Sequence, residues 1–258
     1  MGVQWGRMVA DLEEVEQALS AGFDFVQPVN DFPVELSDKQ LQSQKERIQA
    51  GGAPFKVCAV PLPADARVTQ KGFNIYVWVE HLKNAAQRMA QLGCRKLLWS
   101  DGRARVLPVE GAIGEPKEQV RQFLYMLCAV AADFDMDVLV EPLGPRRTNF
   151  LNTMKQTADF LAGITAENLC SLISLRELDQ IEVSLSDIGV YRQLIEHVQM
   201  DNPRSYGGPR ICPRREDEYD YSKFIRALKD AGYSADISLP NDADARSLEY
   251  CRGLWSAG

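Results

Sequence analysis

Short apolar segments alternate with longer amphipathic segments along the chain, and the alternation repeats about eight times. The apolar segments have the length of buried strands, and the longer segments carry apolar residues at helical spacing. Strict alternation of strand and helix implies a parallel sheet, and eight such units imply closure into a barrel. We therefore predict an α/β protein of the (β/α)8 TIM barrel class, with strands near residues 3–9, 23–27, 55–60, 96–99, 137–141, 169–174, 197–200 and 235–239.

The connections between these segments support the same fold. Helices are expected near residues 11–21, 38–50, 75–92, 116–134, 152–162 and 221–231. Several end at a glycine directly before the next strand, in SAGFDFV, QLGCRKLL and DAGYSADISL, as a tight helix-to-strand turn requires. An open doubly wound sheet is the alternative, but it usually has fewer strands, and no G-x-G-x-x-G follows a strand here. No linker interrupts the pattern, so residues 1–258 are expected to form one domain.

Composition excludes several functional classes. The net charge of −7 gives no basic surface for a nucleic-acid backbone, and no apolar run approaches the roughly 20 residues of a membrane span. The six cysteines are scattered, without a CxxC pair, and the N-terminus lacks a signal-peptide pattern. We therefore expect a cytoplasmic protein that binds neither nucleic acid nor membrane and forms no disulfide scaffold.

An acidic residue ends the fifth expected strand, in the stretch VLVEPLGPRRTNFLNT. Glu141 follows three apolar residues, and Pro142 ends the strand by withholding a backbone donor. Barrel active sites gather at the carboxyl ends of the strands. The other strand ends predict the remaining pocket lining, formed by Trp5, Gln27, Pro61, Trp99, Ser174, Gln199 and Pro240.

Several segments, in order, resemble the sugar phosphate isomerase/epimerase family, which has a xylose isomerase-like barrel (AP endonuclease family 2). They are WSDGRARVLPVEG, VEPLGPRRTNFLNT, EHVQMDNPRSYGGPR and DYSKFIRALKDAGYSADISL. The resemblance implies a divalent metal held by four side chains. A glutamate ends strand five, an aspartate ends strand six, a histidine belongs to an H-x-H on strand seven, and a glutamate ends strand eight. The metal orients the sugar oxygens, and the two glutamates move the proton.

This chain departs from that ligand set. Glu141 matches the first ligand, whereas Ser174, Gln199 and Pro240 stand at the other three positions. These three side chains supply no negative charge to offset desolvation of a divalent cation. We therefore expect no metal cofactor. Mn²⁺ or Mg²⁺ would require a site rebuilt with Glu177, Asp201 or Asp242, or with Asn241 in place of the strand-eight glutamate.

Glu141 is the predicted catalytic group, acting as a base if burial raises its pKa; the structural alternative is an ion pair with Arg146 or Arg147. Predicted substrate-binding residues are Trp99, Arg105, Arg146, Asn149, His197, Gln199 and Arg204. Arginine suits capture of a phosphate or carboxylate, although a surface ion pair would also explain it. Trp99 could equally be packing, and His197 a buried inner-face histidine. Asn149 and Asn152 could brace the loop or cap the next helix.

Three functions remain in view. The first is a sugar or sugar phosphate isomerase or epimerase that acts on a small carbohydrate or hydroxy-acid with a degenerate metal site. The second is a non-catalytic carbohydrate-binding or regulatory barrel, paired with an active relative. The third, a DNA-repair endonuclease, requires a cluster of metal-binding histidines, and the chain has only two histidines. The expected ligand is thus a small carbohydrate. A homo-oligomer is among the assemblies that the sequence allows.

Overall fold

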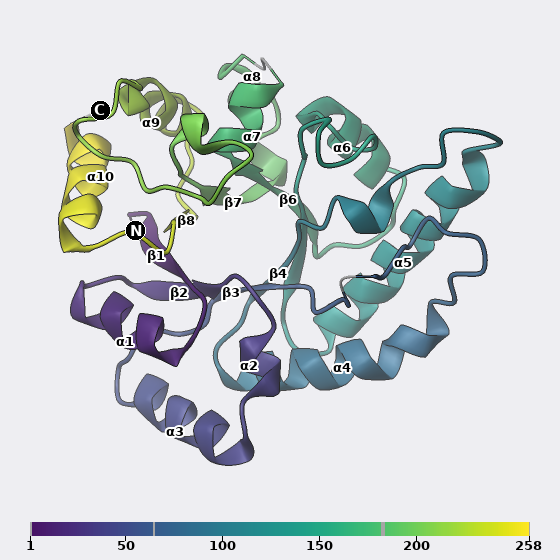
Figure 1. Ribbon diagram of the computed structural model, residues 1–258, viewed down its shortest axis with the longest axis horizontal. Coiled ribbons are helices and arrows are strands. Elements are labelled where there is room, and N and C mark those ends of the chain that lie inside the picture. Colours follow the sequence, from purple (N-terminus) through teal and green to yellow (C-terminus); the bar gives the residue numbers. More distant parts are fainter. Residues whose placement is uncertain (1, 64, 182–183, 258) are drawn as a thin grey trace.

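The computed structural model describes residues 2–63, 65–181 and 184–257, and it confirms the (β/α)8 barrel (Figure 1). Eight parallel strands form one sheet in the order β2-β1-β8-β7-β6-β5-β4-β3. Their bounds are β1 Gln4–Val9, β2 Phe25–Pro28, β3 Val57–Ala59, β4 Lys96–Trp99, β5 Asp137–Val140, β6 Leu169–Ser174, β7 Ile195–Gln199 and β8 Asp236–Leu239. Strands β2 and β3 end the sheet and share no ladder, but the Val26 N–H donates to the Pro54 carbonyl across their gap at 2.9 Å.

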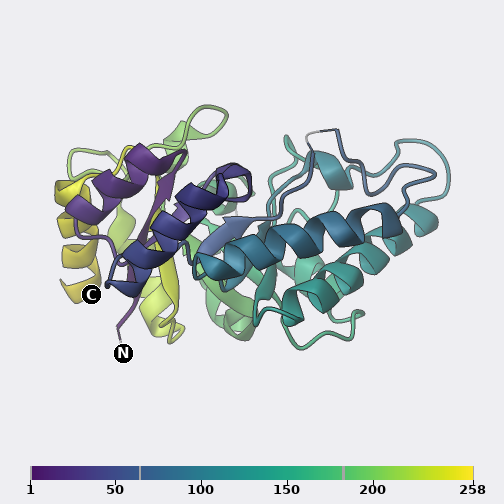
Figure 2. The same cartoon turned by 90° about the horizontal axis from the view of Figure 1, so that it is seen from below.

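Helices surround the barrel (Figures 1 and 2). Six of them fall where helical spacing predicts them: α1 Leu12–Ser20, α3 Asp38–Gln49, α4 Tyr76–Gln91, α5 Gly114–Ala132, α6 Met154–Leu161 and α9 Tyr221–Asp230. Four were not anticipated: α2 Phe32–Glu35, α7 Leu175–Gln180, α8 Asp187–Val190 and α10 Ala245–Ala257. Among the described residues, no helix has the length and apolar character needed to cross a bilayer.

Glycines end the helices as the sequence predicts. Gly22, Gly93 and Gly232 have φ angles of 85°, 84° and 70°, in the left-handed region that a side chain disfavours. Each lies directly between a helix and the strand that follows. The tight turns therefore set the short helix-to-strand spacing that the barrel requires.

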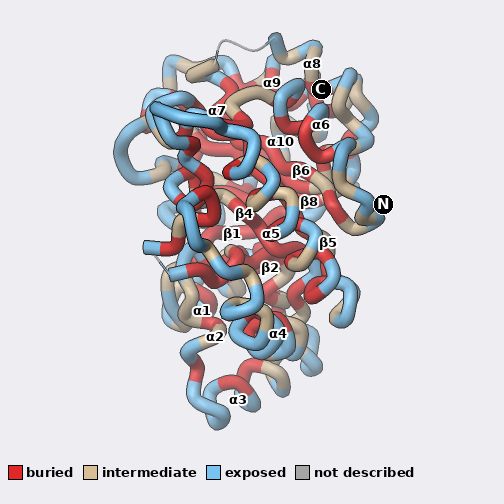
Figure 3. Tube along the Cα trace, turned by 90° about the vertical axis from the view of Figure 1, so that its right-hand side faces the viewer, coloured by how far each residue is buried: buried red, intermediate tan, exposed pale blue. Residues whose placement is uncertain are grey.

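The barrel interior is filled by side chains rather than open. Buried residues follow the strands and the inner faces of the helices (Figure 3). Midway along the barrel, one apolar cluster consists of Phe25, Val57, Leu98, Leu139 and Leu172. Gly6 on β1 makes room for the Phe25 ring, because a Cβ at Gly6 would lie 2.2 Å from a ring carbon. Near the amino ends of the strands, Lys56 and Lys96 both pair with Asp236, at 2.6 and 2.7 Å.

Strand β5 is one residue shorter than expected. It ends at Val140, so Glu141 is the first residue beyond the strand instead of its last. The Glu141 N–H still donates to the Trp99 carbonyl at 3.3 Å. Pro142, which has no N–H, cannot extend this pairing. The correction leaves Glu141 at the carboxyl end of the barrel.

Candidate functional site

Glu141 is fully buried, with an exposed fraction of 0%. Among the described residues, no hydrogen bond of good geometry reaches either of its carboxylate oxygens. Burial raises the pKa of Glu141 above its ordinary value, the positive charge of Arg210 lowers it less strongly, and the nearby Ser100 hydroxyl lowers it slightly. A buried carboxylate with both oxygens unsatisfied is rare in a folded protein and costly to keep. Such a group calls for a functional explanation.

The cation nearest to the Glu141 carboxylate is Arg210, with its Nη2 3.8 Å from Oε1. Its Nη1 donates to Asp201 Oδ2 at 2.5 Å and to Ser174 Oγ at 3.1 Å. The alternative of an ion pair between Glu141 and Arg146 or Arg147 does not hold, because Arg147 pairs with Glu177 and Arg210 faces Glu141. The sequence reasoning missed Arg210, although it lies in the same quoted stretch as Arg204. The local sequence does not show which arginine of that loop turns inward.

The acids proposed as substitute metal ligands are engaged elsewhere. Glu177 accepts from the Gly144 N–H at 2.8 Å and from Arg147 at 3.2 Å. Asp201 accepts from the Arg176 N–H at 3.1 Å as well as from Arg210. Asp242, on the β8 side, accepts from the Cys212 N–H at 2.8 Å and pairs with Arg214 at 3.3 Å.

The described residues contain no group of three or more His, Cys, Asp or Glu side chains that could hold a metal. Arginine already occupies one oxygen of Asp201, and a serine, an amide and a proline stand at the other expected ligand positions. These donors do not fit the carboxylate-rich set that Mg²⁺ or Mn²⁺ prefers.

Two predicted binding residues, His197 and Gln199, lie inside the barrel on β7. His197 is fully buried, and its Nε2 lies 3.0 Å from Gln27 Oε1. Burial, with a smaller contribution from the charge of Lys96, lowers the pKa of His197 to about 3. The imidazole is therefore neutral at ordinary pH, as expected for a buried inner-face histidine. Gln199 is 3% exposed, and its Oε1 has no partner among the described residues.

Trp99 and Arg105 form a buried layer beside Glu141. Arg105 is fully buried and donates through Nη2 to the Glu141 carbonyl oxygen, and its guanidinium carbon lies 5.5 Å from the centre of the Trp99 ring. Burial lowers the pKa of Arg105 to about 10, which still leaves it charged. Trp99 also packs against Phe123 with ring centres 5.2 Å apart. Both residues therefore pack next to the Glu141 backbone, Arg105 by a hydrogen bond to its carbonyl and Trp99 by contact with the Arg105 guanidinium.

The other three predicted binding residues are exposed. Arg146 lies over the ring of Tyr206 at 5.9 Å. Asn149 exchanges two hydrogen bonds with the backbone of Leu107, at 2.8 and 3.0 Å, which confirms the expected bracing role. Arg204 pairs with Glu218 at the surface, at 2.8 Å. Contact with a ligand stays a prediction for all seven binding residues.

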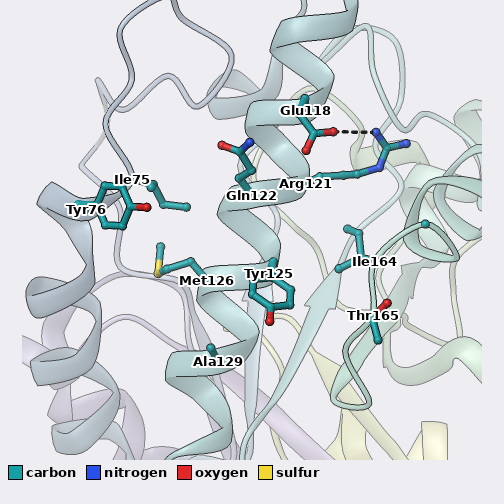
Figure 4. A pocket seen from close by; sticks show the side chains of 11 residues that line it. Ile75, Tyr76, Glu118, Arg121, Gln122, Tyr125, Met126, Ala129, Ile164 and Thr165 are labelled. Atoms are coloured by element: carbon teal, nitrogen blue, oxygen red, sulfur yellow. Dashed lines mark hydrogen bonds and ion pairs between the residues drawn. The ribbon is translucent and has the colours of Figure 1, made fainter.

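A cleft of about 710 Å³ opens over the carboxyl ends of β2, β3 and β4 and beside the loop after β5. Trp99 and Arg146 line it, together with Asn30, Asp31, Ser100, Asp101, Arg103 and Arg147 and several apolar residues. Glu141 is not in its wall. A second hollow, of about 570 Å³, lies outside the barrel against α5, between Tyr76, Tyr125 and Ile164 (Figure 4). None of the predicted site residues lines this second hollow, so the first cleft is the candidate site.

Comparisons with known proteins agree with the barrel. A family model described as a xylose isomerase-like TIM barrel matches residues 15–240. Similar solved structures include D-allulose 3-epimerase from Methylomonas sp., with a TM-score of 0.80, 16% identity and 98% of each chain covered. D-psicose 3-epimerase from Clostridium cellulolyticum H10 has a TM-score of 0.81 at 15% identity, over 98% of this chain and 99% of that one. 3-Keto-D-glucoside 4-epimerase from E. coli has a TM-score of 0.76 at 16% identity, over 97% of this chain and 99% of that one. No curated protein matches the chain by sequence.

Proposed function

This chain belongs to the xylose isomerase-like TIM barrel family, and we propose that it acts on a small sugar, sugar phosphate or hydroxy-acid by isomerase-type proton transfer without a divalent metal. The observation that carries the proposal is Glu141, a buried carboxylate with both oxygens unsatisfied at the carboxyl end of β5. Active sites of such barrels lie at this end. The sugar epimerases among the similar structures support a carbohydrate ligand.

Because Glu141 is the only base proposed for this site, isomerisation is favoured over epimerisation. Glu141 would take a proton from the carbon beside the carbonyl and return it to the carbonyl carbon, while the hydroxyl proton passes between the two neighbouring oxygens, so that an aldose and a ketose interconvert through an enediolate. Arg210, 3.8 Å from Glu141, would stabilise the negative charge that develops on the sugar oxygen. Inversion at one carbon needs a second base on the opposite face. The nearby acids Glu177 and Asp201 are bound to arginines and do not supply one.

The test is deuterium exchange in heavy water, followed by NMR for ketoses, aldoses and their phosphates in the presence of EDTA. We expect the wild-type protein to exchange the carbon-bound proton of one substrate pair, and Glu141→Gln to lower the rate by at least about 100-fold. Glu118→Gln, which changes an exposed glutamate on α5, is the control. Exchange that requires added Mn²⁺, or that survives Glu141→Gln, would contradict the proposal.

The second candidate is binding without turnover, and the complete burial of Glu141 favours it. The carboxylate lies outside the wall of the cleft, so a ligand reaches it only if the residues that cover it move. Calorimetry with the same sugars separates the two functions. Saturable binding with no proton exchange in any pair would establish the non-catalytic role.

A further inference from the structure

The guanidinium of Arg210 lies among the carboxyl ends of three neighbouring strands. It contacts Ser174 at the end of β6, Asp201 just after β7 and Glu141 just after β5, at 3.1, 2.5 and 3.8 Å. Its side chain is only 18% exposed. Divalent cations in proteins are held by converging oxygen atoms of this kind. Here an arginine occupies the centre.

The loop that carries Arg210 is fastened to the barrel. The Asn202 N–H donates to the Ile211 carbonyl at 2.8 Å, so the loop folds back on itself. At its far end, the Cys212 N–H donates to Asp242 at 2.8 Å. In its middle, Arg176 from α7 donates to the Gly208 carbonyl at 3.1 Å. These contacts hold Arg210 over the strand ends.

Charge balance explains why a cation is needed there. Glu141 and Asp201 are both fully buried. Arg176 also contacts Asp201, at 3.5 Å, but among the described residues only Arg210 forms an ion pair with Glu141. A guanidinium keeps its charge at every accessible pH and offers five donors in a plane. Removing it would leave buried negative charge without compensation, which destabilises a fold strongly.

We propose that Arg210 is a built-in cation that takes the place of a divalent metal and holds Glu141 and Asp201 in a metal-independent cluster. A bound ion would need to lie about 2.0–2.6 Å from the carboxylate oxygens. Arg210 Nη1 is already 2.5 Å from Asp201 Oδ2, so an ion could bind that oxygen only by displacing the guanidinium. The inference concerns charge and folding, and it holds whether or not the protein turns over a sugar.

Thermal unfolding of Arg210→Gln tests the charge balance. The melting temperature should fall by roughly 6–20 °C, because a buried ion cluster loses its cation. The matched control is Arg204→Gln in the same loop, which breaks an exposed pair with Glu218 of 2.8 Å. It should shift the melting temperature by less than about 4 °C. Equal shifts for the two variants would overturn the proposal.

A charge-compensated variant separates loss of the cation from loss of packing. Glu141→Gln and Asp201→Asn, added to Arg210→Gln, remove both negative charges while keeping the side-chain volumes close. We expect the triple variant to melt several degrees above Arg210→Gln alone. If Arg210→Gln does not fold, recovery of a folded triple variant carries the same meaning. A triple variant no more stable than the single one would show that Arg210 acts only by packing.

The response to Mn²⁺ tests replacement of the metal directly. The melting temperature of the wild-type protein should be the same, within error, in EDTA and in excess Mn²⁺. Metal analysis of the purified protein should find no stoichiometric ion. A stoichiometric ion, or an Mn²⁺-dependent rise in melting temperature that Glu141→Gln abolishes, would show that a metal binds where we place Arg210.

Discussion

Glu141 and His197 show how burial sets the charge of single residues in this barrel. Burial raises the pKa of Glu141 and lowers that of His197, so both shifts favour the neutral form. Arg210 lies 3.8 Å from Glu141, a separation at which the attraction is about 4 kcal/mol in a protein-like dielectric. Desolvation costs several kcal/mol per buried ion, roughly the same size. The direction of the Glu141 shift indicates that burial dominates.

Replacement of His197 should change how stability depends on pH. Its pKa is about 3 in the folded protein and roughly 6.5 in an unfolded chain, so the unfolded chain binds the additional proton between these values. The stability contributed by the neutral imidazole is therefore present above about pH 6.5 and is lost as the pH falls, by up to about 1.4 kcal/mol per pH unit.

Denaturant unfolding of the wild type and His197→Gln from pH 7 to pH 4 measures this contribution. The difference between their unfolding free energies should shrink as the pH falls, because glutamine does not titrate. Comparing the two proteins cancels the titration of the acids, which both share. A difference that stays constant over this range would show that His197 does not titrate on unfolding as described.

The loop after β5 shows how an element is held in a strained path. Leu151 has a φ of 59°, in the left-handed region, although its side chain is buried. This conformation costs a non-glycine residue roughly 1–2 kcal/mol. The Asn152 side chain compensates by donating to the carbonyls of Leu143 and Thr148, both at 2.8 Å. The Thr153 side chain then caps α6 by accepting from the Gln156 N–H at 3.1 Å.

Asn152→Ala should loosen this loop. The loss of two hydrogen bonds to backbone carbonyls should lower the unfolding free energy by about 1–3 kcal/mol and expose the chain at Arg146 and Arg147 to trypsin. Asn168→Ala is the control, because Asn168 donates to the carbonyls of Cys128 and Met136 at 3.0 and 2.9 Å, away from this loop.

Mass spectrometry of early tryptic fragments distinguishes the two variants. The control should lose comparable stability without faster cleavage after Arg146 or Arg147. Faster cleavage in both variants would mean that global unfolding exposes the loop, and that Asn152 has no local role.

At the scale of the molecule, the first two strands of the barrel fit tightly against each other. The ring of Phe25 on β2 crosses over Gly6 on β1 and joins the central apolar cluster. This contact lies beside the gap between β2 and β3, where the Val26 N–H makes a hydrogen bond of 2.9 Å to Pro54. The packing of the central apolar cluster therefore depends on a position where a Cβ would collide with the Phe25 ring.

Gly6→Ala should therefore destabilise the whole barrel. An added methyl group would meet the Phe25 ring, and overpacking of this kind costs about 1–3 kcal/mol, or roughly 2–12 °C in melting temperature for a domain of this size. Gly189→Ala, on α8, is the control, since no described heavy atom beyond its chain neighbours and its own helix backbone lies within 4 Å of its added Cβ. Calorimetric scans compare the two, and equal melting temperatures would show that the interior adjusts at little cost.

The sequence predicted the barrel because its main signals are local. Apolar runs, helical spacing and glycines such as Gly22, Gly93 and Gly232 act within a few residues, and their alternation permits few ways to pair the strands. The same signals placed Glu141 at the carboxyl end of β5. The connection after β6 was less predictable, because α7 and α8 are too short to show a clear helical period.

The tertiary structure alone decided how the site is assembled. Contacts such as Arg210 with Glu141 or Glu177 with Gly144 join residues far apart in the chain. Several arginines lie in similar local sequence, so the sequence does not show which arginine pairs with which acid. Only the path of the loops decides this. The sequence by itself thus determined the framework and the place of Glu141 at the carboxyl end of β5, through short-range periodicity. The folded chain determined which cation faces that carboxylate, because electrostatic partners are chosen by distance in space.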